Sequence, residues 1–297
     1  MKKTCIVTGA SKGIGRGIAT VLARDEGYVV YATARTESKL VELASSIESN
    51  PHNKGGCVVP VVVDHSSDES TKKLIDRAFS ETGRIDVLVN NAYGGVFAIG
   101  ETFGKKFWEK PLSVWDASHN VGLRSHYIAS ALSVPHMIKN KSGLIINISS
   151  PAGKGYLFDI AYGVGKQAVD RLSCDMATEL QGTGVNVLTL WPGAVNTEST
   201  SFPGAETPEF SGKAIASLIR DPACASKYNG KIIQTRELAD MYNFCDIDGK
   251  LPATGNSQLA MRKAIENATP IQWQLNSKLP KPTDPAMKIF FQRQGKL

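Results

Sequence analysis

The amino-acid sequence predicts a doubly wound α/β fold, in which one parallel sheet of seven strands carries helices on both faces. Short apolar runs rich in β-branched residues alternate along the chain with longer segments of helical period. Several runs are apolar throughout, as expected for strands covered on both faces. A glycine-rich turn joins the first run to the first helical segment. This alternation is typical of parallel β-α-β units joined by right-handed crossovers.

The strands are expected at seven short runs bounded by polar or glycine-containing segments. The first run holds Cys5, Ile6 and Val7, and the third is apolar throughout, with Pro60 inside it. We predict strands at residues 3–7, 28–34, 58–63, 86–89, 144–148, 185–190 and 231–234.

Helices are expected between these strands. In the first helical segment, Ile18, Val21 and Leu22 recur at helical spacing, and the pattern stops at Gly27. Further helical patterns cover residues 40–47, 69–80, 114–139 and 162–180.

The chain divides into a patterned body and a less regular tail. Residues 1–250 are expected to form one Rossmann-type domain that includes the loops around its binding crevice. From about Leu251 the pattern weakens into Pro, Asn, Gln and Lys, so residues 251–297 are predicted to be a basic C-terminal extension of unknown role. A helix lying on a membrane surface is the alternative for this tail, but no apolar stripe is long enough to favour it.

Composition excludes several classes of protein. The chain has 297 residues, 42% of them hydrophobic and 21% charged, which is ordinary for a globular protein and unlike fibrous or disordered chains. No run approaches the ~18 apolar residues of a membrane-spanning helix, and the apolar start is too short for a secretory signal. The five cysteines are dispersed and never form a Cys-x-x-Cys pair, which predicts a reducing compartment and no zinc or other metal site.

Charge is concentrated in the tail. The formal net charge is +6, and residues 251–297 carry seven Lys or Arg against two Asp or Glu. The body is therefore almost neutral, which excludes a nucleic-acid-binding domain, because such a domain needs a basic surface.

The turn after the first strand has the features of a phosphate-binding loop. Its sequence is Thr8-Gly9-Ala10-Ser11-Lys12-Gly13-Ile14-Gly15, directly before a helix. Glycines let backbone N–H groups approach a pyrophosphate, and the opening helix offers unpaired donors and the positive end of its dipole. A dinucleotide is the predicted ligand. The residues expected to bind it here are Gly9, Ser11, Lys12, Gly13, Ile14 and Gly15.

The end of the second strand favours NADP(H) over NAD(H). An acidic residue here would bind the ribose 2′-hydroxyl of NAD, but the sequence is Thr33-Ala34-Arg35. Arg35 and Lys12 are placed to receive a 2′-phosphate, and the less favoured alternative is that both are ordinary solvated cations. Asp64, after the third strand, is a candidate partner for adenine, and its alternative role is to form a turn or helix cap.

A tyrosine and a lysine stand four residues apart, on one face of a predicted helix. A nearby ammonium such as that of Lys166 would help to lower the pKa of the phenol of Tyr162 from ~10 toward neutrality. Ser149 and Ser150 end the fifth strand, so either hydroxyl could face the same crevice and hold a substrate oxygen.

These motifs resemble, in order and spacing, the short-chain dehydrogenase/reductase superfamily over about residues 3–250. Within it, several further segments resemble the branch called dehydrogenase/reductase SDR family member 1. The superfamily match rests on the glycine turn, Asn90-Asn91-Ala92, Asn120, the serine pair, Tyr162-x-x-x-Lys166 and Pro192-Gly193 with Thr197. The branch match rests on Asn91-Ala92-Tyr93, Phe107-Trp108-Glu109-x-Pro111, Trp115-Asp116, Asn120-Val121-Gly122-Leu123-Arg124, Tyr162-Gly163-Val164-Gly165-Lys166 and Trp191-Pro192-Gly193.

The resemblance implies specific catalytic roles. Tyr162 would be the general acid and base, and Lys166 would lower its pKa and bind the nicotinamide ribose. Ser150 would orient the carbonyl, and Asn120 would anchor a water in a proton relay. Ser150 fits better than Ser149 because Ala152-Gly153 follows it as in the family, although its spacing to Tyr162 is one residue short.

The resemblance also implies cofactor contacts beyond the glycine turn. Asn90 and Ala92 would border the adenosine ribose, and Pro192, Val195 and Thr197 would wrap the nicotinamide carboxamide, with Tyr162 and Lys166 close by. This chain departs from the family's Asn-Asn-Ala-Gly in having a bulky tyrosine at position 93. The following Gly94 and Gly95 are expected to absorb the displacement.

The expected activity is NADP(H)-dependent interconversion of a carbonyl and an alcohol, with reduction of a hydrophobic ketone or aldehyde favoured. A module that binds NADP(H) and acts through a partner with little catalysis is the alternative. Aromatic residues in the loops suggest a hydrophobic pocket, although several could simply pack the loops. These residues are Tyr93, Phe97, Phe103, Trp108, Tyr156, Phe158 and Phe202.

Assembly and location are also predicted. The family resemblance implies a homodimer or homotetramer formed by the helices that carry Asn120 and Tyr162. The cytoplasm is the expected location. Gly295-Lys296-Leu297 matches the peroxisomal Ser-Lys-Leu address in two of three positions, so the peroxisome is an alternative, as is peripheral membrane contact through the basic tail.

Overall fold

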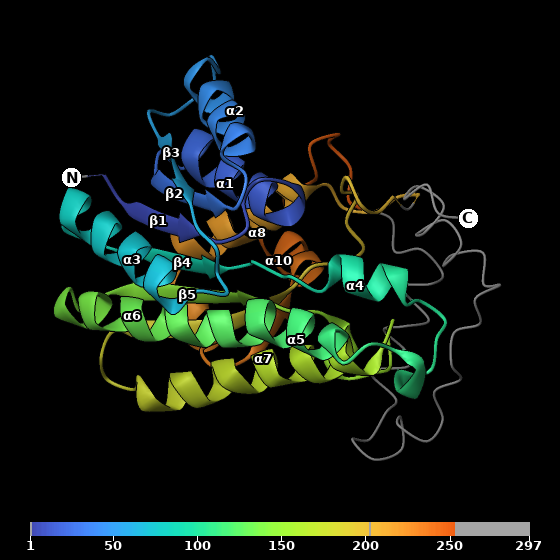
Figure 1. The fold of residues 1–297 in the computed structure, drawn as a ribbon. Coiled ribbons are helices and arrows are strands. Elements are labelled where there is room, and N and C mark those ends of the chain that lie inside the picture. Colours follow the sequence, from blue (N-terminus) through green and yellow to red (C-terminus); the bar gives the residue numbers. More distant parts are fainter. Residues whose placement is uncertain (1, 202, 253–297) are drawn as a thin grey trace.

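The computed structural model describes residues 2–201 and 203–252, and Figure 1 shows one sheet with helices on its two faces. Neighbouring strands in this part of the chain all pair in parallel, in the order β3-β2-β1-β4-β5-β6-β7. The predicted seven-stranded, doubly wound α/β fold is therefore confirmed. The strands are β1 (Thr4–Val7), β2 (Val29–Ala34), β3 (Cys57–Val62), β4 (Val87–Asn90), β5 (Gly143–Ile148), β6 (Val185–Trp191) and β7 (Ile232–Gln234).

Strand order reverses between β1 and β4. The chain builds outward from β1 through β2 to β3, then returns to place β4 on the other side of β1. Ligands of doubly wound sheets bind in the crevice beyond the carboxyl ends of the strands at such a reversal. The glycine-rich turn follows β1 at this edge.

Side chains on β1 alternate between two hydrophobic cores, as the period of a strand requires. Cys5 and Val7 pack into one core and Ile6 into the other. Figure 1 shows the helices of the two cores on opposite sides of the sheet. The first core includes α1 (Gly13–Arg24), α2 (Glu37–Glu48) and α8 (Pro208–Arg220), and the second α3 (Asp68–Thr82), α6 (Ser125–Lys139) and α7 (Ile160–Glu179).

Helix α8 is an addition to the predicted elements, and it packs tightly against α1. A Cβ atom at Gly17 would collide with the main chain at Pro208, and one at Gly212 would lie 2.8 Å from Cβ of Val21. Glycines on both helices therefore allow the close approach. The other additions are α4 (Val96–Glu101), α9 (Pro222–Lys227), α10 (Thr235–Tyr242) and the short turns η1 (Phe107–Glu109) and η3 (Pro151–Gly153).

The predicted continuous helix over residues 114–139 is wrong at its middle. It consists of α5 (Ser113–His119) and α6, joined by the wider turn η2 (Asn120–Arg124). Val121 has φ −115° and ψ 97°, and Gly122 has φ +144°, so neither residue is helical. The N–H of Ser125 donates to the carbonyl of Asn120, five residues back. Such π-type bulges are frequent at functional sites.

Within residues 2–201 and 203–252, no helix is long and apolar enough to cross a membrane. The same residues contain no group of three or more His, Cys, Asp or Glu placed to hold a metal ion. The predicted extension, apart from Leu251 and Pro252, and its Gly295-Lys296-Leu297 ending lie outside the described residues. The boundary at residue 250 therefore stays a prediction.

Candidate active site

The glycine-rich turn has the conformation that a close approach of backbone to a ligand requires. Gly9 and Gly13 have φ of +68° and +54°, in the left-handed region that favours glycine. A Cβ atom at Gly15 would collide with the carbonyl oxygen of Gly9 and with the side chain of Asn91. In the same turn Ser11 is half-buried, Lys12 is exposed and Ile14 packs against the first core.

Thr8 and Asn91 brace this turn against the end of β4. The hydroxyl of Thr8 accepts hydrogen bonds from the N–H groups of Asn91 at 2.9 Å and Ala92 at 3.0 Å. The side-chain amide of Asn91 donates to the carbonyls of Thr8 at 2.8 Å and Gly9 at 3.0 Å. Ala92, predicted to border the adenosine ribose, thus lies beside the turn.

Asn90 has a different role from its neighbours. Its side chain is fully buried and donates to Oδ1 of Asn147 at 2.8 Å and to the hydroxyl of Ser130 at 3.0 Å. These bonds tie β4 to β5 and α6. The side-chain N–H groups of Asn90 are therefore engaged in the core, and its predicted place beside the adenosine ribose stays a prediction.

The residues predicted to contact the adenosine part of the coenzyme follow three strands: Lys12 follows β1, Arg35 follows β2 and Asp64 follows β3. Arg35 is exposed, and Nζ of Lys12 lies 5.0 Å from the ring centre of Phe97. Asp64 accepts hydrogen bonds from the N–H of Ser66 at 2.9 Å and from its hydroxyl at 2.8 Å. Those bonds hold the pKa of Asp64 below its usual range. Its alternative role in a turn is thus observed.

Tyr162 and Lys166 lie on one face of α7, whose first turn is capped by Asp159. The carboxylate of Asp159 accepts a hydrogen bond from the N–H of Tyr162 at 2.7 Å. Nζ of Lys166 donates to the carbonyl of Ile148 at 3.0 Å, which fixes the ammonium at the end of β5. The strand and the helix thus hold the two side chains at the carboxyl edge of the sheet.

The electrostatics of this pair differ from the sequence-based expectation. Burial raises the pKa of Tyr162, against the lowering effect of its hydrogen bond with Ser150. Burial also lowers the pKa of Lys166 to about 8, opposed by the nearby Asp170. In the surroundings that the described residues provide, the phenol is therefore held in its protonated form.

The two serines after β5 have separate surroundings. The Ser149 hydroxyl donates to the carbonyl of Lys166 at 3.1 Å and is buried under α7. The Ser150 hydroxyl accepts a hydrogen bond from the N–H of Ala152 at 3.2 Å, and it lies close enough to Tyr162 to lower the pKa of the phenol. Ser150, not Ser149, thus faces the phenol. Asn120, the fourth predicted catalytic residue, is exposed at the bulge between α5 and α6.

The segment after β6 folds back over the glycine-rich turn. Pro192 and Val195 are buried. The Thr197 hydroxyl accepts from the N–H of Thr200 at 3.1 Å, and the methyl group of Thr197 lies against Gly13. The N–H of Gly13 donates to the carboxylate of Glu198 at 3.0 Å. The loop carrying the predicted nicotinamide contacts therefore closes one side of the crevice.

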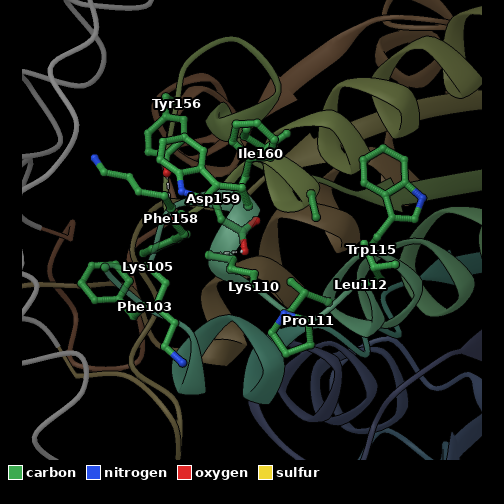
Figure 2. Close-up of a pocket in the computed structure, with 16 residues that line it drawn as sticks. Phe103, Lys105, Lys110, Pro111, Leu112, Trp115, Tyr156, Phe158, Asp159 and Ile160 are labelled. Carbon is green, nitrogen blue, oxygen red and sulfur yellow. Dashed lines mark hydrogen bonds and ion pairs between the residues drawn. The ribbon is translucent and has the colours of Figure 1, made fainter.

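A cavity of about 530 Å³ opens beside α7 (Figure 2). Lys110 and Asp159 form an ion pair in its wall, with 3.0 Å between Nζ and Oδ2, and both side chains are almost fully buried. Four of the predicted aromatics, Phe103, Trp108, Tyr156 and Phe158, line it together with Phe107 and Trp115. Tyr93 and Phe97 do not line it, and Phe202 lies outside the described residues.

A family model described as short chain dehydrogenase matches residues 3–206, which include the glycine turn, the serine pair, Tyr162 and Lys166. The chain belongs to the short-chain dehydrogenase family. It is therefore an oxidoreductase with a fold that binds a nicotinamide coenzyme, and the superfamily resemblance of the sequence is confirmed.

Relatives and solved structures agree with this assignment. The chain is 41% identical over 299 aligned positions to dehydrogenase/reductase SDR family member 1 of Mus musculus, covering 94% of this chain and 92% of that protein. A metagenomic short-chain oxidoreductase in complex with NADP matches with a TM-score of 0.65 and 29% identity, covering 78% of this chain and 95% of that one. A 7α-hydroxysteroid dehydrogenase complexed with NADH and 7-oxo glycochenodeoxycholic acid matches with a TM-score of 0.68 and 27% identity, covering 78% and 92%.

Three residues of this short-chain dehydrogenase were not among the predicted site residues, although contacts place them at the site. They are Asn91, Glu198 and Glu206. Glu206 accepts from the N–H of Gly193 at 3.0 Å and from the hydroxyl of Thr235 at 2.6 Å, so it anchors the turn after β6. Only Asn91, inside the Asn90-Asn91-Ala92 motif, carried a sequence signal; the two glutamates act through contacts distant in sequence.

Proposed function

We propose that this chain is an NADP(H)-dependent oxidoreductase that interconverts a carbonyl and an alcohol, with reduction of a hydrophobic ketone or aldehyde as its main direction. The observation that carries this proposal is that Ser150 lies close enough to the phenol of Tyr162 to lower its pKa, with Lys166 one helical turn away on α7. A serine, a phenol and an ammonium together can hold a carbonyl oxygen and give it a proton.

The chain's own residues supply proton transfer and positioning. Ser150 would hold the substrate oxygen, and Tyr162 would donate its proton to that oxygen. The raised pKa of Tyr162 keeps the proton on the phenol at neutral pH, which suits reduction. Lys166 would bind the nicotinamide ribose, and Asn120 would anchor the water that returns a proton. The bound coenzyme supplies the hydride for the carbonyl carbon.

The residues around the glycine-rich turn fit a dinucleotide. The N–H of Gly13 is available to an anion, because it donates to the carboxylate of Glu198. The absence of a Cβ atom at Gly15 lets the turn stay close to the carbonyl of Gly9. Exposed Arg35 and Lys12, with no carboxylate at the end of β2, support NADP(H) over NAD(H). The predicted contacts of Ala92, Pro192, Val195 and Thr197 with the coenzyme belong to this proposal.

The cavity supports a hydrophobic substrate. Its volume of about 530 Å³ and its aromatic wall suit a compound of drug-like size with few polar groups. Phe158 joins the cavity to the site, because its ring meets that of Tyr162 edge-on at 5.4 Å. Its φ of +67° is strained for a residue other than glycine, as is common in residues that shape binding sites.

Turnover and binding measurements test this proposal together. Purified protein should oxidise NADPH in the presence of ketones, aldehydes or quinones, and Tyr162→Phe should lower kcat by ~10²–10⁴-fold while NADPH still binds. Equal turnover by the parent and Tyr162→Phe would overturn the mechanism. Binding of NADPH without turnover of any compound would support the alternative, a coenzyme-binding module.

Coenzyme choice has its own test. Arg35→Gln should weaken NADPH binding by about tenfold and leave NADH binding unchanged, because only NADPH carries the 2′-phosphate. Arg171→Gln, which removes an exposed arginine on α7, is the matched control. An equal loss for both coenzymes would show that Arg35 does not recognise the phosphate.

A further inference from the structure

Tyr93, three residues beyond the end of β4, contacts both members of the candidate catalytic pair, Tyr162 and Lys166. Its hydroxyl donates to the hydroxyl of Ser118 on α5 at 3.1 Å, which fixes the plane of the ring. Burial raises the pKa of the Tyr93 phenol, so the ring stays neutral. A bulky side chain therefore fills a position where related sequences were expected to carry glycine.

Two glycines make the space for this ring. A Cβ atom at Gly95 would collide with the Tyr93 hydroxyl, and one at Gly122 would lie 2.6 Å from Cδ2 of Tyr93. Gly122 sits at the bulge between α5 and α6 with φ +144°. The ring and the bulge are thus fitted to each other.

The ring of Tyr93 contacts both members of the pair on α7. Nζ of Lys166 lies 5.0 Å from the centre of the Tyr93 ring, against 5.8 Å from that of Tyr162. The rings of Tyr93 and Tyr162 meet edge-to-face, with centres 5.6 Å apart and planes at 71°. The Tyr162 ring therefore has two aromatic neighbours in T-shaped contact, Tyr93 and Phe158.

Lys166 needs such a neighbour because burial disfavours its charged form. Burial lowers the pKa of Lys166 to about 8, and the hydrogen bond to the carbonyl of Ile148 uses only one of its three donors. The negative face of an aromatic ring stabilises an ammonium within about 6 Å of its centre. Tyr93 offers this face without adding a charge.

We infer that Tyr93 is a positioning residue of the site: its ring face holds the Lys166 ammonium, and its T-shaped contact fixes the Tyr162 ring. This inference rests on the proposed roles of Tyr162 and Lys166. The other titratable groups around the cluster are Asp159 and Asp170 on α7, His126 on α6 and His119 on α5. His126 stays neutral, because burial lowers its pKa to about 3.

The test measures the protonation of Lys166 directly. The ¹⁵Nζ resonance of Lys166, assigned with Lys166→Arg, is titrated in the full-length parent and in variants at position 93. Tyr93→Leu removes the ring and should lower the pKa of Lys166 by about half a pH unit or more. Tyr93→Phe keeps the ring and is the matched control, expected within ~0.2 units of the parent. In a plot of kcat against pH, the pKa of the alkaline limb should shift in the same direction as the pKa of Lys166 measured by NMR.

A further variant covers the case in which Tyr93→Leu does not fold. Pentafluorophenylalanine at position 93 keeps the shape of phenylalanine but makes the ring face partially positive. The pKa of Lys166 should therefore fall relative to Tyr93→Phe. Identical pKa values in the folded variants would overturn the inference and leave the ring as a space-filler. Because the titration needs no turnover, this failure is distinct from failure of the proposed function, which Tyr162→Phe tests.

Discussion

The carboxylate of Glu198 accepts a hydrogen bond from the backbone N–H of Gly13 at 3.0 Å, at the first residue of α1. Glu198 comes from the loop after β6, so two segments far apart in sequence meet across the crevice. The N-terminus of a helix favours an anion, and a carboxylate and a phosphate would use the same donor. Glu198 therefore competes with the predicted coenzyme for this donor.

Glu198→Gln should tighten NADPH binding by about three- to tenfold, because the neutral amide competes less well with a phosphate. Fluorescence titration of NADPH measures the Kd. Glu48→Gln, which removes an exposed carboxylate at the end of α2, controls for net charge. An unchanged or weaker Kd in Glu198→Gln would show that the carboxylate does not compete.

The ion pair of Lys110 and Asp159 should stabilise the fold as a unit. Lys110→Met leaves the buried carboxylate of Asp159 without its cation, which should cost about 3 kcal/mol in the free energy of unfolding. Adding Asp159→Asn should recover much of that loss, because asparagine also caps helices well. Urea unfolding of the single and double variants measures the difference. If the stability losses of Lys110→Met and Asp159→Asn summed to that of the double variant, the two side chains would not be coupled.

Glu206 should make stability depend on pH. Burial raises the pKa of Glu206 from 4.5 to about 7. The protonated carboxyl therefore contributes to folding stability fully below about pH 4.5, and that contribution is lost as pH rises through 7. Glu206→Gln keeps the acceptor for Gly193 and Thr235 but cannot ionise. The variant should be more stable than the parent by roughly 1–3 kcal/mol at pH 8 and show little difference at pH 5. Thermal unfolding of the parent and the variant at pH 5 and pH 8 measures this. An equal stability difference at the two pH values would contradict a raised pKa for Glu206.

Lys166 should make coenzyme binding sensitive to alkaline pH. Its pKa is lowered from 10.5 to about 8, so the folded protein loses the ammonium as pH rises through 8. NADPH binding should weaken by about tenfold between pH 7 and pH 9.5, because a charged donor to the ribose is lost. Isothermal titration across this range measures it. Lys166→Arg, which keeps its charge, should flatten the dependence, and a flat parent profile would refute the role.

Local pattern was enough to predict the sheet, the glycine turn and the shared face of Tyr162 and Lys166. Strand period, turn chemistry and helical spacing are properties of adjacent residues. The break at Gly122 was missed because the apolar pattern continues through it. The bulge accommodates the ring of Tyr93, which is distant in sequence. The contact of Glu198 was missed because it depends on how a distant loop folds. The catalytic and coenzyme roles, the oligomeric state and the location stay predictions.

The fit between Tyr93 and Gly122 has an evolutionary consequence. Any side chain at position 122 would overlap the aromatic ring, and loss of the ring would leave a hole beneath the bulge. Substitutions at either position alone should therefore be selected against. Descendants of a common ancestor should keep both residues or exchange both, and such paired inheritance would mark the lineage that shares this arrangement.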